Sequence, residues 1–267
     1  MNTKIKIYQV DAFTNNLFSG NPVAVCLLDN WLSDETMQSI ALENNLSETA
    51  FLIKKKGKFF LRWFTPKVEI DLCGHATLAT AHILYSEMNL KSDFIEFHIK
   101  SGDVLTLNRN ENLLIINFPA YEPKIVDHSL EELYNAFGVR PKSFLYCKYG
   151  LVVFNKKEEI IKIVPNLNVI EKLPYDGIFI TTPGENVDFV SRFFAPKLGI
   201  PEDPVTGGAH CELIPYWSKR LNKKNMIAKQ LSKRSGLIYC SYLGARVTMG
   251  GEVTTYMQGE LLMGNKK

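Results

Sequence analysis

The chain has 267 residues, of which 46% are hydrophobic and 22% charged, and its formal net charge at pH 7 is +3. This composition is typical of a folded globular protein and excludes a disordered or low-complexity chain. No apolar run approaches the roughly 20 residues that cross a bilayer, and the first residues lack the apolar core of a signal peptide. We therefore expect a cytoplasmic protein with no membrane partner.

The cysteines and the basic residues exclude two further classes. The five cysteines are scattered and include no C-x-x-C pair, so neither a disulfide framework nor a structural zinc site is indicated. Residues 219–234 carry seven basic side chains and no acidic one. A solvated face explains this run better than a polyanion site does, and we expect no nucleic-acid partner.

Alternation, capping and turn residues predict a mixed order of strands and helices. Ser33 followed by two acids predicts a helix over residues 34–44, and the capping box that starts at Ser129 predicts another over 130–137, which Gly138 ends. Strands are predicted at residues 4–10, 23–28, 47–53, 59–64, 94–99, 104–107, 113–118, 144–147, 151–155, 177–182 and 189–194. Gly250 and Gly251 predict a tight turn between two late strands, the last of which returns to the first domain.

One stretch occurs twice, 130 residues apart. Residues 62–70 read RWFTPKVEI and residues 192–200 read RFFAPKLGI, and each copy precedes a turn with glycine that enters an apolar segment. The first such segment, residues 76–85, is apolar or small on nearly every face, which predicts a helix buried on all sides. So long a period indicates a duplicated half and not a solenoid. We place the halves at residues 1–119 and 128–255, with 120–127 as the linker.

The two duplicated turns are also the best candidates for a binding site. Each would place the N-terminus of a helix, with its free N–H groups and positive dipole end, where an anion could bind. Gly74, Gly207 and Gly208 would let a ligand approach the backbone closely, although each glycine alone is explained as well by a tight turn. The acidic and basic residues near the turns are Glu48, Asp71, His75, Glu202, Asp203 and His210.

Several chemistries lack their motifs in this sequence. Neither turn has the glycine spacing of a P-loop or a dinucleotide site, no G-x-S-x-G elbow occurs, and the five histidines do not cluster as metal ligands would. Proton transfer by side chains, with no cofactor and no metal, is the chemistry left. Glu48 begins a segment that enters the core, and partial desolvation would suit it to this task, although a surface acid at a strand end is the simpler interpretation of that residue alone.

Four motifs together resemble the PhzF-like isomerase family of phenazine biosynthesis, within the diaminopimelate epimerase-like superfamily. They are D-A-F with G-N-P at residues 11–22, S-E-T-A-F at 47–51, C-G-H-A-T at 73–77 and E-D-P-V-T-G-G-A-H-C at 202–211. The resemblance runs in order along essentially the whole chain. It implies an α+β fold of two pseudo-symmetric halves, each a curled mixed or antiparallel sheet around a central helix, with the site in the cleft between them.

The resemblance also implies a function. It implies a cofactor-independent isomerase, a homodimer, whose substrate is a small carboxylate, with Glu48 as general acid/base and with His75 and Asp203 as its partners. The turns of Gly74 and of Thr206, Gly207 and Gly208 would hold the substrate.

Two departures from the family leave alternatives open. The family often has Gly-Ser-Ala where this chain has Gly207, Gly208 and Ala209, so a hydroxyl that could contact substrate is missing. Related two-base racemases have a cysteine at each turn. Here the first turn has Cys73, and the second has Thr206 at the equivalent position. The alternatives are a Cys73-dependent epimerase or dehydratase and a carboxylate-binding homologue without activity.

Overall fold

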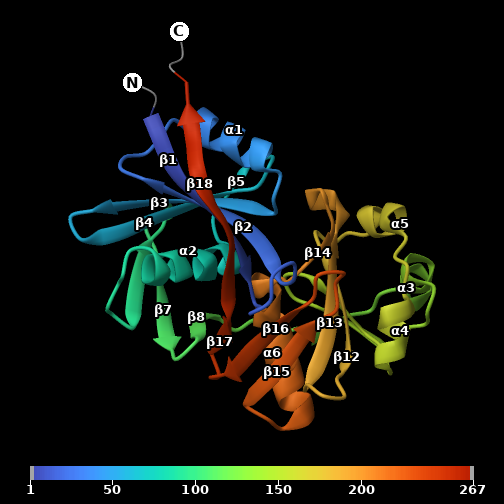
Figure 1. Cartoon of the computed structure of the whole chain (residues 1–267). Coiled ribbons are helices and arrows are strands. Elements are labelled where there is room, and N and C mark those ends of the chain that lie inside the picture. The colour runs from blue at the N-terminus through green and yellow to red at the C-terminus, as the bar shows by residue number, and fades with distance from the viewer. Residues whose placement is uncertain (1–2, 265–267) are drawn as a thin grey trace. The chain divides into compact units, whose positions relative to one another are not determined.

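The computed structural model describes residues 3–264, which form two compact units (Figure 1). The first unit comprises residues up to 117 together with those from 250 onward, and the second comprises residues 118–249. The fold is mixed α/β, with many strands and few helices. No helix among residues 3–264 combines the length and the apolarity that crossing a membrane requires.

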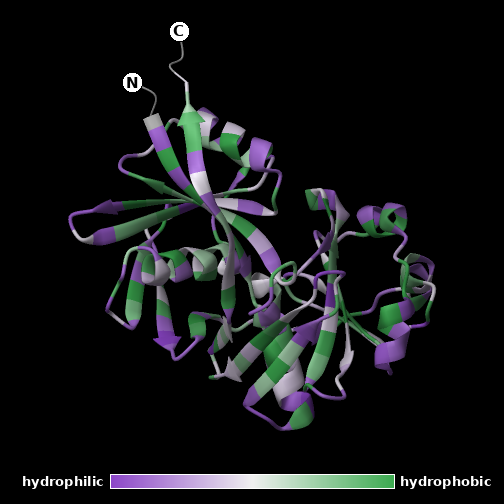
Figure 2. Cartoon of the chain, viewed as in Figure 1, coloured by the Kyte–Doolittle hydropathy of each residue, from purple (hydrophilic) through white to green (hydrophobic). Residues whose placement is uncertain are grey.

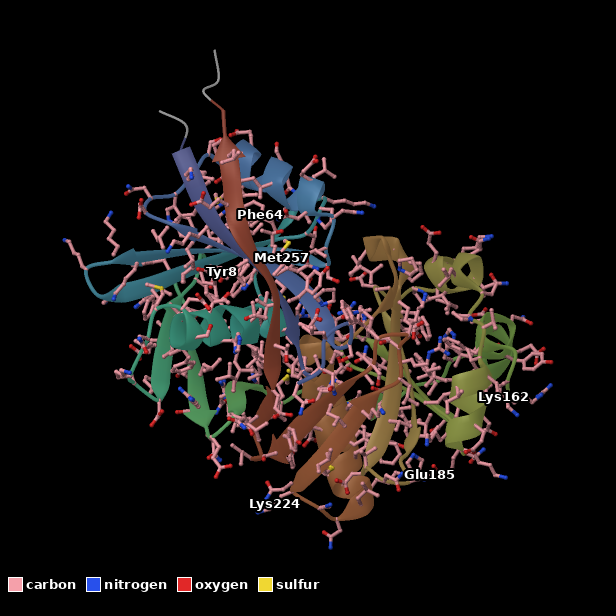
Figure 3. All side chains as sticks on the ribbon, in the orientation of Figure 1. Tyr8, Phe64, Lys162, Glu185, Lys224 and Met257 are labelled. Atoms are coloured by element: carbon pink, nitrogen blue, oxygen red, sulfur yellow. The ribbon has the colours of Figure 1, made fainter. Side chains whose placement is uncertain are left out.

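The first unit is built mainly from sheet. Its elements are β1 (Thr3–Ala12), β2 (Asn21–Leu28), α1 (Asp34–Asn44), β3 (Glu48–Lys55), β4 (Lys58–Phe64), β5 (Glu69–Ile70), α2 (Gly74–Ser86), β6 (Phe94–His98), β7 (Val104–Asn110), β8 (Leu113–Pro119) and β18 (Val253–Met263). Strand β1 pairs antiparallel with both β2 and β18, so the sheet joins segments from the two ends of the chain. Figure 3 labels Tyr8 on β1 and Met257 on β18, which lie on this strand pair.

The order of pairing in the first unit alternates between parallel and antiparallel. Strand β2 pairs parallel with β3, β3 antiparallel with β4, and β4 both antiparallel with β5 and parallel with β6. Helix α2 forms the connection before β6 and packs against β1, β2 and β3. Its residues are buried on almost every face, and in Figure 2 it lacks the alternation of hydrophilic and hydrophobic residues that α1 shows.

The second unit repeats this order of pairing. Its elements are β9 (Lys124–Ile125), α3 (Leu130–Phe137), β10 (Ser143–Tyr146), β11 (Gly150–Val153), α4 (Lys157–Lys162), α5 (Leu167–Lys172), β12 (Ile178–Pro183), β13 (Phe189–Ala195), the 3-10 helix η1 (Pro196–Leu198), β14 (Ile200–Asp203), α6 (Gly207–Leu221), β15 (Asn225–Gln230), β16 (Gly236–Tyr242) and β17 (Arg246–Gly251). Strand β11 pairs parallel with β12, β12 antiparallel with β13, and β13 both antiparallel with β14 and parallel with β15.

The arginine that begins each copy of the repeated stretch makes the same kind of ion pair. Arg62 of β4 binds both carboxylate oxygens of Glu69, at 2.7 and 2.8 Å, and Arg192 of β13 binds those of Glu202 at 2.7 and 3.0 Å. Each guanidinium also lies over the ring of the phenylalanine two residues on, Phe64 or Phe194. These bidentate pairs join the strand to the short strand that leads into the turn, and so fix where the turn begins.

Predicted elements and observed ones agree over most of the chain, with one clear error. Helices α1 and α3 have the predicted bounds, and Ser33 and Ser129 cap them through side-chain oxygens. The tight turn at Gly250 and Gly251 is wrong, because both residues belong to β17. A side chain at Gly251 would place its Cβ 2.6 Å from Cδ1 of Phe13, so this glycine serves close packing and not a turn.

Candidate active site

The candidate site of the first unit begins with Glu48. It is the first residue of β3, and its neighbour on the parallel strand is Val23 of β2. Only 8% of the residue is exposed, although a carboxylate is among the groups that are costliest to bury. Asn45, the residue that caps the C-terminus of α1, has a left-handed φ of 48°. This turn directs the chain into the strand. The acid is therefore placed inside the unit by regular secondary structure.

His75 supplies the partner of this acid. It is the second residue of α2, and its Nε2 lies 2.8 Å from Oε2 of Glu48. Its Nδ1 lies 3.5 Å from Sγ of Cys73, the residue that precedes the helix. Burial lowers the pKa of the His75 imidazole, but the negative charge that Cys73 and Glu48 can carry outweighs it and raises this pKa well above its ordinary value. The surroundings of His75 thus favour its protonated form.

The buried carboxylate of Glu48 is held by its contact with His75. Its Oε2 lies 2.8 Å from Nε2 of His75 and makes no hydrogen bond to another group among residues 3–264. A carboxylate buried with so few partners is costly to keep, and groups kept at such a cost are candidates for a functional role.

Asn21 and Ser47 complete the surroundings of His75. The Ser47 hydroxyl donates to Oδ1 of Asn21 at 3.2 Å, and the Asn21 amide lies 3.5 Å from Nδ1 of His75. Asn21 is fully buried and follows Gly20, whose φ is +68°. A Cβ at Gly20 would lie 2.2 Å from the carbonyl oxygen of Ala12, so only glycine allows the loop to bring Asn21 here.

The second turn is held by a different network. Thr206, which precedes α6, donates its hydroxyl to Oδ2 of Asp203 at 2.6 Å. Gln230 of β15 is fully buried; its amide donates to the Asp203 carbonyl at 2.8 Å, and its Oε1 accepts the Thr206 N–H at 2.9 Å. The turn at the start of α6 is therefore fixed from two strands.

The two glycines of this turn differ in their surroundings. Gly207 is buried and Gly208 is exposed. A Cβ at Gly208 would meet no atom within 4 Å. Local packing would therefore allow a side chain such as that of serine at position 208, and the fold does not require the absence of a hydroxyl there.

The predicted site residues thus fall into two groups, one in each unit. The first unit brings together Glu48, Gly74 and His75, with Cys73 beside them. The second brings together Asp203, Thr206, Gly207 and Gly208. The roles predicted for these residues, and the predicted partnership of Asp203 with Glu48, stay predictions.

The remaining acids and bases near the turns have structural partners or exposed positions. Asp71 is exposed, and Glu202 binds Arg192. His210 is fully buried, and burial lowers its pKa to about 4, so the neutral ring donates from Nδ1 to the Thr206 carbonyl at 2.8 Å.

Sequence reasoning missed three polar residues near the turns. Asn21 and Ser47 lie within the motifs given above, which was the available signal for them, whereas nothing local in the sequence distinguishes Gln230.

Sequence reasoning also missed that three residues of metal-ligating types lie together. One ligand atom each from Glu48, Cys73 and His75 lies within 4.8 Å of the others, a set that could hold a metal ion.

Comparison with known proteins assigns this architecture to a class. A hydroxyproline epimerase from Agrobacterium vitis, solved with trans-4-hydroxy-L-proline, matches with a TM-score of 0.64 over 98% of this chain and 94% of its own; at 7% identity the likeness concerns the fold alone. The fold is thus of the epimerase-like kind.

Closer relatives define the family. The family model described as phenazine biosynthesis-like protein matches residues 10–259. An uncharacterised isomerase of Pseudomonas aeruginosa is 44% identical, over 97% of this chain and 98% of its own. A crystal structure of a PhzF-family protein from Enterococcus faecalis has a TM-score of 0.95 at 41% identity, over 98% of this chain and all of its own. The chain belongs to the phenazine biosynthesis-like, or PhzF-like, family of isomerases.

Proposed function

We propose that the protein is a cofactor-independent isomerase that moves a proton within a small carboxylate substrate, with Glu48 as the acid/base. The observation that carries the proposal is the buried Glu48 carboxylate, whose Oε2 lies 2.8 Å from Nε2 of His75. Membership of an isomerase family supports the reaction class.

In the proposed reaction, Glu48 removes a proton from a carbon next to a carbonyl or double bond. The electron pair of the broken C–H bond passes into the conjugated system, and the protonated Glu48 then returns the proton to another carbon. His75 holds the Glu48 carboxylate in position through the contact of 2.8 Å. The first N–H groups of α2 have no partner within the helix, and Cys73 makes no capping hydrogen bond, so these donors suit the negative charge of the substrate.

The second turn is proposed to act on the same substrate. We infer that the two units are pseudo-symmetric copies of one half, each with a sheet curled around one helix. The repeated order of strand pairing and the doubled Arg–Glu pair support this inference. Asp203 would then be the second acid, and Thr206, Gly207 and Gly208 would offer a second set of donors. The homodimer implied by the resemblance stays a prediction.

The test is solvent exchange during turnover. Candidate unsaturated and amino-acid-like carboxylates are incubated in deuterated water, and the migrating position is followed by NMR. We expect Glu48→Gln to lower the rate by about 10²–10⁴-fold, because the proton acceptor is lost. Asp71→Asn is the matched control, since it removes an exposed acid from the same turn and should leave the rate unchanged.

Two outcomes would contradict the proposal. Normal exchange by a folded Glu48→Gln protein would show that another group moves the proton. Binding of a carboxylate without any exchange in the wild type would favour a binding protein that has kept the fold and has no activity.

A further inference from the structure

We propose that Glu48, Cys73 and His75 bind a zinc ion, and that bound zinc blocks the acid/base reaction. The binding of the ion rests on the geometry of these three side chains alone. The inhibition rests in addition on the proposed function of Glu48.

The ligand atoms already lie near the positions that zinc requires. His75 Nε2 lies 2.8 Å from Glu48 Oε2 and 3.9 Å from Cys73 Sγ, and one ligand atom from each of the three residues lies within 4.8 Å of the others. In a tetrahedral site with zinc–ligand bonds of about 2.0–2.3 Å, neighbouring ligand atoms are roughly 3.3–3.6 Å apart. The observed distances lie on either side of this range, so the Glu48 and His75 atoms would have to move apart and Cys73 Sγ to move towards them, by up to about an ångström, to close the site.

The chemistry of the donors selects the metal. Thiolate and imidazole favour zinc over magnesium or calcium, which prefer oxygen ligands. Three protein ligands leave one tetrahedral position for water, the arrangement of open zinc sites. A site of this kind needs no fourth side chain.

Oε2 of Glu48 has no partner outside the cluster among residues 3–264. It lies 2.8 Å from Nε2 of His75 and makes no further hydrogen bond, and only 8% of the residue is exposed. A zinc ion would bind this oxygen in place of its contact with His75. The ligands are also well supported, because Glu48 begins β3 while Cys73 and His75 flank the first residue of α2.

The electrostatic balance favours the cation. The N-terminus of α2 is equivalent to about half a positive charge, which disfavours a metal ion nearby. The Glu48 carboxylate and the Cys73 thiolate supply two negative charges at direct contact, which outweigh it. Zinc binds the thiolate and the neutral imidazole, so binding releases whatever protons these two groups carry and weakens as pH falls.

Bound zinc would use the groups that the reaction needs. Glu48 could no longer accept a proton through the coordinated oxygen. His75 would bind the metal through an electron pair of its ring and so could not carry a positive charge beside Glu48. We therefore expect reversible inhibition that a chelator relieves.

Cobalt(II) is the probe for binding, because it replaces zinc in such sites and absorbs light. Titration of the full-length protein should produce a thiolate-to-cobalt charge-transfer band and tetrahedral d–d bands that saturate at one equivalent, and added zinc should remove both. In Cys73→Ser the charge-transfer band should be lost and zinc affinity should fall about 100-fold or more. The matched control is Cys211→Ser, a change at another buried thiol, which should keep the band.

A second measurement avoids any folding defect of the variant. In the wild type, zinc should protect Cys73 from N-ethylmaleimide, while Cys147, which is less buried, reacts with or without zinc and serves as the internal reference. Labelling of each peptide is read by mass spectrometry. Because Cys73 is buried, its slow labelling is first followed to a measurable extent in zinc-free protein, and an unchanged rate on adding zinc would overturn the proposal.

The remaining outcomes separate this proposal from the proposed function. Absence of a stoichiometric charge-transfer band, or an unchanged band in a folded Cys73→Ser protein, would exclude the site whatever the enzyme does. Stimulation of turnover by zinc would overturn the inhibition. If no substrate shows exchange, the cobalt and alkylation results still decide whether the metal binds.

Discussion

Glu212 of α6 carries a buried carboxyl group whose ionisation should affect stability. Its Oε1 accepts the N–H groups of Lys148 and Tyr149 at 3.2 and 3.0 Å, while its Oε2 has no hydrogen bond within the described chain. Burial raises the pKa of Glu212 to about 7, although the two N–H donors oppose this shift. The residue therefore gains or loses a proton near neutral pH.

The sign of the effect follows from proton counting. Between pH 4.5 and about 7 the native state keeps the Glu212 proton that the unfolded chain has lost, so the free energy of unfolding decreases as pH rises through this window. Glu212→Gln removes the dependence. We expect the variant to gain about 2–3 kcal/mol relative to wild type between pH 5 and pH 8.

Urea unfolding of both proteins at several pH values measures this difference. His210, whose pKa is lowered to about 4, affects stability in the opposite direction at acid pH, but it is present in both proteins and cancels in the comparison. A change at exposed Glu171 to glutamine is the control. Parallel stability curves for wild type and Glu212→Gln would contradict the prediction.

At the residue scale, the sequence indicated which side chains matter better than how they meet. Glu48 and His75 were recognisable as an acid and a base near a turn, but their 2.8 Å contact depends on the pairing of β3 with β2 and the position of α2, which no local pattern encodes. Gln230 is separated by 24 residues from the turn that it holds, and only the folded chain brings them together.

The two repeated Arg–Glu pairs allow a matched comparison of elements. Arg192 donates to Glu202 and also to the carbonyl oxygens of Ile160 and Ile163 at 2.9 and 2.8 Å, so it joins β13, β14 and the end of α4. Arg62 donates to Glu69 and to the exposed acid Asp34. The same residue type in the same sequence context thus supports more of the backbone in the second unit.

We expect Arg192→Lys to destabilise the protein by about 3 kcal/mol, because an ammonium group cannot reach both oxygens of Glu202 and both carbonyl groups. Arg62→Lys should cost only about 1 kcal/mol, since no backbone carbonyl group loses a donor there and its second partner, Asp34, is exposed. Urea midpoints of the two variants, measured together with wild type, provide the test. Equal losses would show that the buried carbonyl contacts contribute little.

At the element scale, prediction succeeded where a helix or strand carries its own signals. Helices α1 and α3 have caps and clear bounds in the sequence. Helices α4 and α5 have six residues each, too few for periodicity to appear, and α4 begins where Glu159 accepts the N–H groups of Asn155 and Lys156. The turn predicted at Gly250 and Gly251 of β17 was wrong because a glycine in a turn and a glycine in a crowded strand cannot be told apart in the sequence.

At the scale of the whole molecule, the first unit depends on a strand that comes last in the chain. Strand β18 pairs with β1 at ten positions, and Leu261 and Met263 pack against the hydrophobic core that includes Ile5 and Ile7. His82 of α2 also contacts Thr255 of β18 through Nε2 at 3.0 Å. Removal of β18 would expose one whole edge of β1.

We expect deletion of the chain after residue 252 to unfold the first unit while the second keeps its core. Hydrogen exchange should show lost protection in residues 3–117 and retained protection in residues 118–249, because the second unit has its own cluster of buried residues on β11, β12 and β13. A chain that ends at residue 264 keeps every described strand and is the control. Unchanged protection in residues 3–117 would show that β18 is dispensable.

This chain order has a consequence for synthesis. Residues 118–249 leave the ribosome as one uninterrupted piece, whereas β1 can pair early with β2 but waits for its second partner, β18, until residue 263 has been released. The first-made half of the protein is thus completed last. Until then its open strand edge is exposed to other nascent chains, and crowding on a polysome would affect this half more than the other.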